Sequence, residues 1–123
     1  MVKLVFCLRR LPHLSREEFQ KYWREKHGPL VRSLAGVLRI QRYVQTHTLS
    51  TPYNDALQQS RGGPSDYDGV AELWWQNLDD LVAAAGTEEG RSAGLALLED
   101  ERKFIDLARS PLFVAEQHEF VGS

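Results

Sequence analysis

Hydrophobic residues recur along this chain with two different periods, and the points where the period changes divide it into secondary-structure elements. A period of two residues is typical of a strand, whereas apolar residues three and four positions apart share one side of a helix. The pattern predicts four strands, at residues 2–9, 38–48, 67–76 and 112–121, and three helices, at residues 16–34, 78–85 and 92–108. The order is therefore β-α-β-β-α-β, with the second helical segment divided in two.

Capping and breaking residues support several of these boundaries. Ser15 and Glu18 form a capping box before the first helix, and Asn77 is a typical capping residue for the helix at 78–85. Pro111 ends the last helix. The long connection at residues 49–66 is polar, contains one or two predicted helical turns, and suits a lid, a partner-contacting arm or a mobile loop.

The β-α-β-β-α-β order indicates an α+β protein of the ferredoxin-like class. In that architecture two interleaved βαβ units form a four-stranded antiparallel sheet with helices on one face. The chain has 123 residues, of which 42% are hydrophobic, and this is enough for one domain with a real core. We therefore expect residues 1–123 to form a single domain.

Both faces of the predicted sheet are largely apolar. In the first strand Val2, Leu4 and Phe6 alternate with Val5 and Cys7. An antiparallel sheet with one face in water normally carries polar residues on that face. We therefore expect the second face to be covered by the same face of another copy, giving a homodimer, a dimeric α/β barrel in which the two sheets enclose a shared interior.

One apolar stripe of the first predicted helix contains an ionisable imidazole. At about 100° per residue, this stripe comprises Phe19, Trp23, His27, Leu30, Val31 and Leu34. His27 is therefore expected to point inward. Two interpretations remain open: the imidazole braces the Gly28-Pro29 exit by bonding a backbone carbonyl, or it is a catalytic group.

Polar side chains interrupt the second face of the sheet and define a candidate site. The residues assigned to this face are Tyr43, Gln45, His47, Glu72, Glu116 and His118. Glu72 and Trp74 form a predicted wall for a small aromatic ligand, and Tyr43 and His47 are further candidates for substrate binding. His118 is either a general base tuned by burial or a histidine of the core or dimer interface.

Glu101 is a further candidate because it lies in the middle of the apolar face of the last predicted helix. A carboxylate in that position needs a partner such as an arginine or His27, or its pKa rises. Structural ion pairing is the alternative to a functional role. The adjacent charged residues at 99–103 are expected to form a solvated surface.

Composition excludes several classes of partner. The net charge is −2 with acids and bases interspersed, so no basic field favours nucleic acid or an anionic membrane. The single cysteine, Cys7, cannot form an internal disulfide, which suits the cytoplasm. No CxxC, HExxH, GxSxG or phosphate-binding loop is present, and we expect neither a metal nor another cofactor.

Five stretches carry a family resemblance: residues 3–10, 15–19, 67–75 and 110–116, and above all Trp23-x-x-x-His27-Gly28-Pro29. Over residues 1 to about 121 the chain resembles EthD-domain proteins of the dimeric α+β barrel superfamily. The resemblance implies a ferredoxin-like protomer, a homodimer formed through the sheets and a cofactor-free cavity in each subunit. EthD accompanies an oxidative pathway for fuel ethers, and other members resemble polyketide cyclases, dehydratases and decarboxylases.

The first functional hypothesis is therefore a small, cofactor-independent enzyme that binds an apolar aromatic or carbonyl-bearing molecule in the barrel. His27 or His118 would supply acid-base chemistry for oxidation, dehydration or cyclisation, with Glu72 or Tyr43 orienting the substrate. The second hypothesis is a non-catalytic ligand-binding or accessory protein of a catabolic pathway, in which the histidines are structural. A third, a haem-binding barrel, needs a single histidine ligand.

Overall fold

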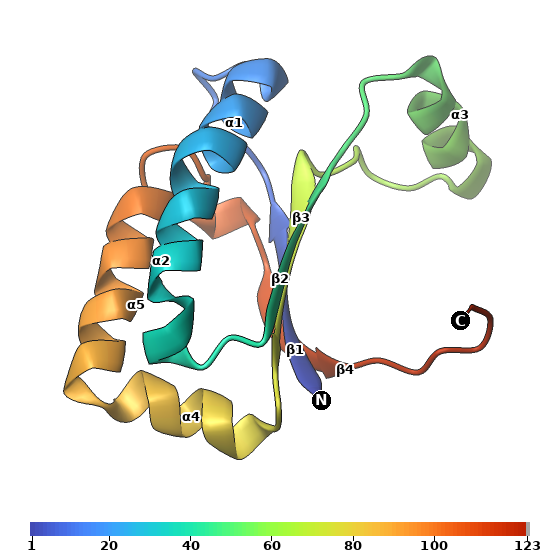
Figure 1. The fold of residues 1–123 in the computed structure, drawn as a ribbon. Helices are drawn as coiled ribbons and strands as arrows, with labels where there is room; N and C mark the ends of the chain where they lie inside the picture. Colours follow the sequence, from blue (N-terminus) through green and yellow to red (C-terminus); the bar gives the residue numbers. More distant parts are fainter. Residues whose placement is uncertain (123) are drawn as a thin grey trace.

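A computed structural model describes residues 1–122 and contains the predicted alternation of strands and helices (Figure 1). The strands are β1 (Val2–Leu8), β2 (Arg42–His47), β3 (Gly69–Trp75) and β4 (Leu112–Glu116). The helices are α1 (Arg16–Tyr22), the π-helical turn η1 (Trp23–His27), α2 (Gly28–Leu38), α3 (Pro52–Arg61), α4 (Leu78–Gly86), α5 (Glu88–Glu101) and the 3-10 turn η2 (Leu107–Arg109).

The four strands form one antiparallel sheet in the order β2-β3-β1-β4. Helices α1, α2, α4 and α5 cover one face of this sheet, as Figure 1 shows. The two outer strands each pair with a central strand from the other βαβ unit, which is the interleaving that defines the ferredoxin-like fold. The predicted fold class is confirmed.

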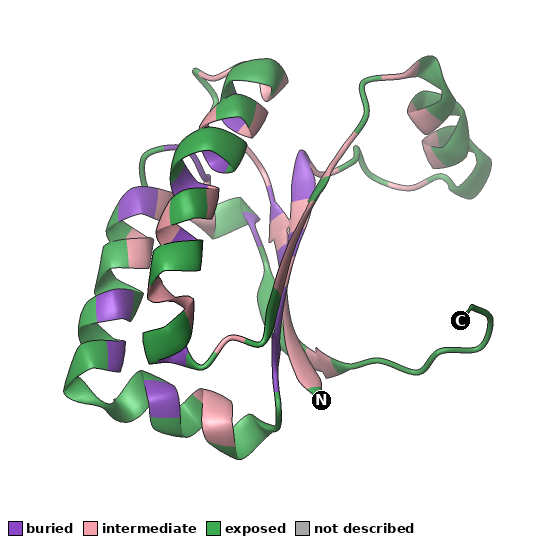
Figure 2. Ribbon diagram, viewed as in Figure 1, coloured by how far each residue is buried: buried purple, intermediate pink, exposed green. Residues whose placement is uncertain are grey.

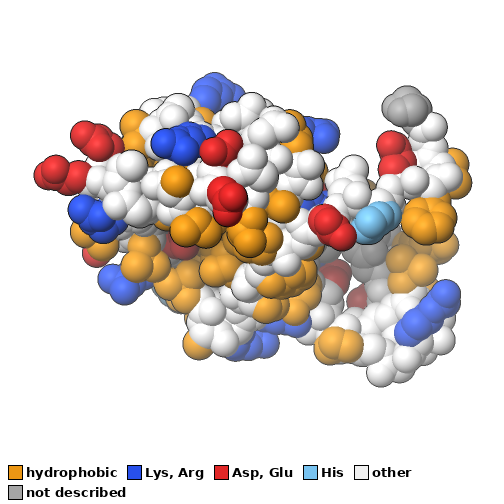
Figure 3. Space-filling view, turned by 90° about the horizontal axis from the view of Figure 1, so that it is seen from below, with side chains coloured by type: hydrophobic (Ala, Val, Ile, Leu, Met, Phe, Trp, Pro, Cys, Tyr) orange, Lys and Arg blue, Asp and Glu red, His pale blue; other side chains and the backbone are white. Residues whose placement is uncertain are grey.

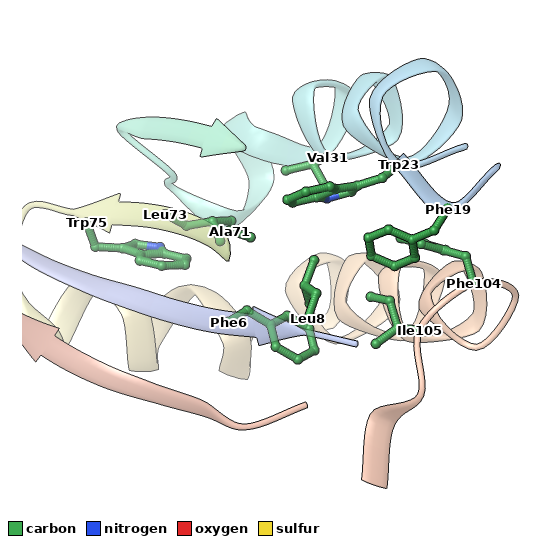
Figure 4. Close-up of a cluster of buried hydrophobic side chains, with 10 residues drawn as sticks. All are labelled: Phe6, Leu8, Phe19, Trp23, Val31, Ala71, Leu73, Trp75, Phe104 and Ile105. Carbon is green, nitrogen blue, oxygen red and sulfur yellow. The ribbon is translucent and has the colours of Figure 1, made fainter. Parts of the chain in front are cut away.

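The hydrophobic core lies between this covered face and the helices (Figure 2). Figure 4 shows the cluster, in which Trp23 and Phe19 from the helical side face Leu8 of β1 and Ile105. The even-numbered residues of β1 supply the core side chains, because successive side chains of a strand point to opposite faces. The two sheet faces are therefore unequal, and only one of them is packed by the protomer itself.

The first predicted helix is one continuous helical rod with a widened turn in its middle. The Gly28 N–H bonds the Trp23 carbonyl five residues back, which makes residues Trp23–His27 a π turn. Pro29 follows immediately, and it has no N–H to donate to the carbonyl four residues earlier. The wide turn accommodates this missing bond, and such turns are frequent at functional sites.

Several boundaries differ from the predictions. The helix ends at Leu38 rather than at residue 34, because Arg39 adopts the left-handed conformation (φ 60°), and β2 begins only at Arg42. Residues 87–91 are not a link, because Thr87 caps α5 directly, and α5 ends at Glu101 rather than at residue 108. The last strand stops at Glu116.

The connection at residues 49–66 forms the ten-residue helix α3 instead of one or two turns. Thr51 caps this helix and Pro52 starts it, while Gly62 ends it in the left-handed conformation (φ 62°). Figure 1 shows α3 projecting on the side of the sheet opposite to α1, α2 and α5. None of its residues is buried in the protomer.

The second face of the sheet carries no helix of the same protomer (Figure 1). Strand register assigns to it Val5, Cys7, Val70, Trp74 and Phe113, together with the polar residues Lys3, Arg42 and Glu72. Figure 3 shows the molecule from below, at one end of the sheet and not directly onto this face, with charges of both signs scattered among hydrophobic side chains. No helix within residues 1–122 is long and apolar enough to cross a membrane.

Candidate active site

A cavity of about 210 Å³ lies between the helices and the covered face of the sheet. Aliphatic and aromatic side chains form most of its wall, and the titratable side chains on that wall are His27, Tyr43 and Glu101. An apolar cavity with a few convergent polar groups is the usual form of a small-molecule site. This space lies within one protomer, whereas the sequence predicted a cavity between two sheets.

The π turn η1 brings His27 to the cavity wall and against α5 at the same time. Only 5% of His27 is exposed, and its Nδ1 lies 2.8 Å from Oδ2 of Asp100. Because a carboxylate only accepts hydrogen bonds, Nδ1 carries the proton and the neutral ring keeps a lone pair on Nε2. No residue within 1–122 makes a hydrogen bond to that Nε2.

Asp100 is held by several donors on the far side of His27. The Tyr22 hydroxyl donates to Oδ1 at 2.6 Å, and Lys103 Nζ lies 3.5 Å from the same oxygen. Burial acts to raise the pKa of Asp100, but the hydrogen bonds from Tyr22 and His27 outweigh it and the pKa is lowered. Burial, together with the Asp100 charge, raises the pKa of Tyr22 to about 12. Asp100 is therefore ionised and Tyr22 keeps its proton at neutral pH.

Burial sets the protonation state of His27. It lowers the pKa of the imidazole below its ordinary value, and the nearby Asp100 carboxylate only partly opposes this effect. His27 is consequently neutral near pH 7, with Asp100 ready to stabilise the imidazolium that forms when it accepts a proton. A carboxylate-oriented histidine of this kind is the arrangement of a general base.

Glu101 is the second titratable group of the cavity and lies one residue after Asp100 at the end of α5. Its carboxyl has no hydrogen bond or ion pair with any residue of the described range 1–122, so the ion-pair partner expected from the sequence is absent there. Burial, with the adjacent Asp100 charge, raises the pKa of Glu101 to about 7. Near neutral pH the carboxyl therefore gives up or takes up a proton readily.

Tyr43, Gln45 and His47 form a hydrogen-bonded chain along β2. Gln45 Nε2 donates to the Tyr43 hydroxyl at 2.8 Å and to the Trp23 carbonyl at 2.9 Å, and its Oε1 lies 2.7 Å from His47 Nε2. Burial raises the pKa of Tyr43 and lowers that of His47. This chain ties β2 to the π turn.

The face assigned to these residues from the sequence was wrong. Tyr43 lies opposite Leu73, and His47 lies opposite Gly69, so both belong to the helix-covered face. His47 stacks on the Trp23 ring at 4.4 Å between centroids, and its buried Nδ1 has no partner within residues 1–122. Of the two, Tyr43 lines the cavity and His47 supports its wall.

Glu72 and Trp74 lie on the open face, across the sheet from the cavity. Glu72 is ion-paired with Lys3. The Trp74 ring lies beneath two cationic groups, with Lys3 Nζ at 5.3 Å and the Arg42 guanidinium at 4.6 Å from its centroid. These contacts occupy the indole that was expected to bind an aromatic ligand, and the two residues do not join His27.

His118 lies beyond the end of β4 and is not near the cavity. Its side chain is 72% exposed. Its one side-chain hydrogen bond among residues 1–122 joins Nε2 to Oε1 of Glu116 at 3.2 Å. The predicted strand to residue 121 would have carried it into the sheet, but the strand ends at Glu116. Pairing of β4 with β1 places Glu116 opposite Val2. Glu116 therefore belongs to the helix-covered face and not to the open face, where the sequence had placed it.

Asp100 and Tyr22 belong to the site although the sequence analysis did not select them. Residues 99–103 were expected to form a solvated surface, yet Asp100 is only 9% exposed. His27 was one of the partners suggested for Glu101, but it bonds the adjacent Asp100 instead, and Glu101 has the raised pKa that was expected for a carboxyl without a partner. No three His, Cys, Asp or Glu side chains in residues 1–122 are grouped as a metal site.

The comparisons with known proteins agree with this fold. The family description "EthD domain" matches residues 11–108, which is most of the chain. The chain belongs to the EthD family. The matched residues include η1, Asp100 and Glu101.

Solved structures extend the likeness of this EthD-family protein over nearly its full length. An ethyl tert-butyl ether D (EthD) family protein from Bacillus halodurans superimposes with a TM-score of 0.63 at 23% identity, covering 96% of this chain and 99% of that one. A dimeric protein of unknown function and ferredoxin-like fold from Bacteroides fragilis gives 0.59 at 13%, covering 94% and 95%.

SnoaB from Streptomyces nogalater, described as a cofactor-independent oxygenase, gives a TM-score of 0.52 at 14% identity, with 99% and 97% of the two chains covered. At these identities the likeness concerns the fold. A search of curated protein sequences finds no match for this EthD-family chain.

Proposed function

We propose that this EthD-family protein is a small, cofactor-independent enzyme that performs acid-base chemistry on an apolar aromatic or carbonyl-bearing molecule. The observation that carries the proposal is the pairing of two groups on one apolar cavity wall: an imidazole backed by a carboxylate, and a carboxyl without a partner in the described residues. A description of SnoaB as a cofactor-independent oxygenase, on a similar fold, supports the same class of chemistry.

In the proposed reaction His27 Nε2 removes a proton from the substrate, either from a carbon next to a carbonyl or from a phenolic oxygen. Asp100 stabilises the resulting imidazolium through Nδ1–H. Protonated Glu101 donates a hydrogen bond to the substrate oxygen on which negative charge develops. Tyr43 bonds the same or a neighbouring substrate oxygen. In a dehydration the carbanion then expels a neighbouring hydroxyl group, which takes the Glu101 proton and leaves as water. In a cyclisation it attacks a carbonyl carbon of the same molecule, whose oxygen takes that proton. In an oxidation the carbanion or phenolate gives electrons to molecular oxygen, which is the oxidant and takes up the protons.

We further infer that the protein is a homodimer formed through the open sheet face. Val5, Cys7, Val70 and Phe113 give that face an apolar centre that no helix of the protomer covers. The Bacteroides neighbour of similar fold is described as dimeric. Helix α3 projects on the same side of the sheet, where a second copy of the chain would contact it.

The test is turnover of a panel of phenolic, quinonoid and β-dicarbonyl compounds by wild type, His27→Gln, Glu101→Gln and the double variant. Loss of about 100-fold or more in kcat/KM for each single variant is the expected result for positioned acid-base groups. His118→Gln is the matched control, since that histidine is exposed and remote. Unchanged turnover in the double variant would rule out the mechanism, and saturable binding without any turnover would favour the ligand-binding alternative.

A further inference from the structure

A groove of about 420 Å³ runs between the π turn with α2 on one side and the edge strand β2 on the other. Gly28, Pro29 and Ala35 keep its helical wall low, and Gln41 and Gln45 belong to its strand wall. Edge strand β2 has a hydrogen-bonded neighbour only in β3, so no further strand within residues 1–122 pairs with it on this side. The groove is therefore open to small molecules from solvent.

The charged residues that line the groove are all arginines: Arg24, Arg32 and Arg42. Arg24 and Arg32 make no ion pair with any carboxylate in residues 1–122, in contrast to Arg10 and Arg16, which both bond Asp68. Arg42 places its guanidinium over Trp74 on the open face. Two arginines thus remain available to an anion in the groove, and the charge of Arg24 already contributes to lowering the pKa of His47.

The groove and the cavity share part of their walls. Val31, Ile40 and Tyr43 line both spaces. The groove and the cavity therefore adjoin at these three residues, and a molecule that extended past them from the cavity would have its outer end near the two arginines. The inner end would lie with His27 and Glu101. Because Glu101 repels an anion when it is ionised, a negative group is disfavoured inside the cavity and favoured in the adjoining groove, which arginines line.

We propose that the substrate carries a carboxylate, which Arg24 and Arg32 bind at the mouth of the cavity while the apolar body reaches His27. This inference rests on the proposed function and adds to it the chemical class and the orientation of the substrate. Arginine is suited to the role because its planar fork bonds both oxygens of a carboxylate. The carboxylate would fix the depth of entry, which decides which atom meets the imidazole.

The test uses isothermal titration calorimetry with 2-naphthoate and its neutral analogue 2-naphthamide. Wild type is expected to bind 2-naphthoate at least about tenfold more tightly, and added salt should reduce the difference. Arg24→Gln combined with Arg32→Gln should bring the two affinities together, and Lys at both positions should restore part of the preference. Arg61→Gln on α3 is the control, because this arginine lies outside the groove and forms no salt bridge within residues 1–122.

A second variant, Leu97→Trp, narrows the cavity without touching the groove and should weaken both probes. Equal affinities in wild type, with both probes weakened by Leu97→Trp, would overturn the carboxylate inference and leave the cavity as a binding site. If wild type prefers 2-naphthoate and Leu97→Trp does not weaken its binding, the anion is held only in the groove. This result would also overturn the carboxylate inference. If neither probe binds, the ligand cavity of the proposed function fails as well.

Discussion

Replacing Glu101 by glutamine should make the protein more stable at alkaline pH while removing activity. The Glu101 carboxyl lies on an apolar wall without a bonding partner in residues 1–122, and its pKa is raised from 4.5 to about 7. A raised carboxyl pKa means that the folded state holds the proton more tightly than the unfolded state. Stability is therefore lost as pH rises from about 4.5 through about 7.

The size of this effect follows from the shift. Each pKa unit corresponds to about 1.4 kcal/mol, so the change from 4.5 to about 7 costs the folded state about 3 kcal/mol above pH 8. Glutamine keeps the shape of the side chain and carries no charge. The Glu101→Gln variant should thus gain about 2–3 kcal/mol in unfolding free energy at pH 8 and show little difference from wild type near pH 4.

Urea denaturation at pH 4, 6 and 8 measures this difference, with Glu99→Gln as the matched control. Glu99 lies on the same helix, but its side chain is 61% exposed, and we expect no comparable change. Equal unfolding free energies of wild type and Glu101→Gln at pH 8 would refute the raised pKa.

The activity of wild type should follow a narrow bell-shaped pH profile near neutral pH. Protonation of His27 limits it on the acid side, and ionisation of Glu101 limits it on the alkaline side.

Three further predictions concern the supports of the site. Asp100→Asn should lower the unfolding free energy by about 1.5–3 kcal/mol in urea at pH 7, and should lower the pKa of His27 in an NMR titration, because the charge that favours the imidazolium is removed. Gly69→Ala should cost about 1–3 kcal/mol in the same assay, since its Cβ would lie 2.3 Å from the Trp23 ring. Val5→Asp, which adds a carboxylate to the centre of the open face, should yield a monomer in light scattering coupled to gel filtration; a dimer would contradict the proposed interface.

The sequence was informative wherever local rules decide the structure. The Ser15 capping box is present, with Ser15 Oγ accepting from the Glu18 N–H at 3.0 Å, and Asn77 caps α4 as expected. Alternation of apolar residues located all four strands within a few residues. Element ends were harder, because the left-handed Arg39 that ends α2 has no glycine signature, and Gly36 lies inside the helix instead.

The site could be predicted only in part, because the faces of strands depend on register. Alternation in β2 separates Tyr43 and His47 from Val44, but it does not tell which set meets the helices. Pairing with β3 decides this, and it is a long-range property. The same limit applies to α5, where adjacent residues differ by about 100° in direction. His27 was expected to point inward, and it does, since the π turn keeps it on the buried side.

The two consecutive acids of α5 explain how one short segment can equip a cavity for acid-base chemistry. Asp100 points to donors, and its pKa falls, whereas Glu101 points to an apolar wall, and its pKa rises. The charge of Asp100 also acts on both other groups of the site, because it stabilises a proton on His27 and disfavours ionisation of Glu101. Burial nevertheless lowers the pKa of His27, and it raises that of Glu101. Environments that separate the pKa values of neighbouring titratable groups in this way assign one as the base, here His27, and the other as the acid, here Glu101. If Glu101→Gln is more stable but inactive, the unpaired carboxyl is retained for its chemistry, since the fold alone would be better off without its charge.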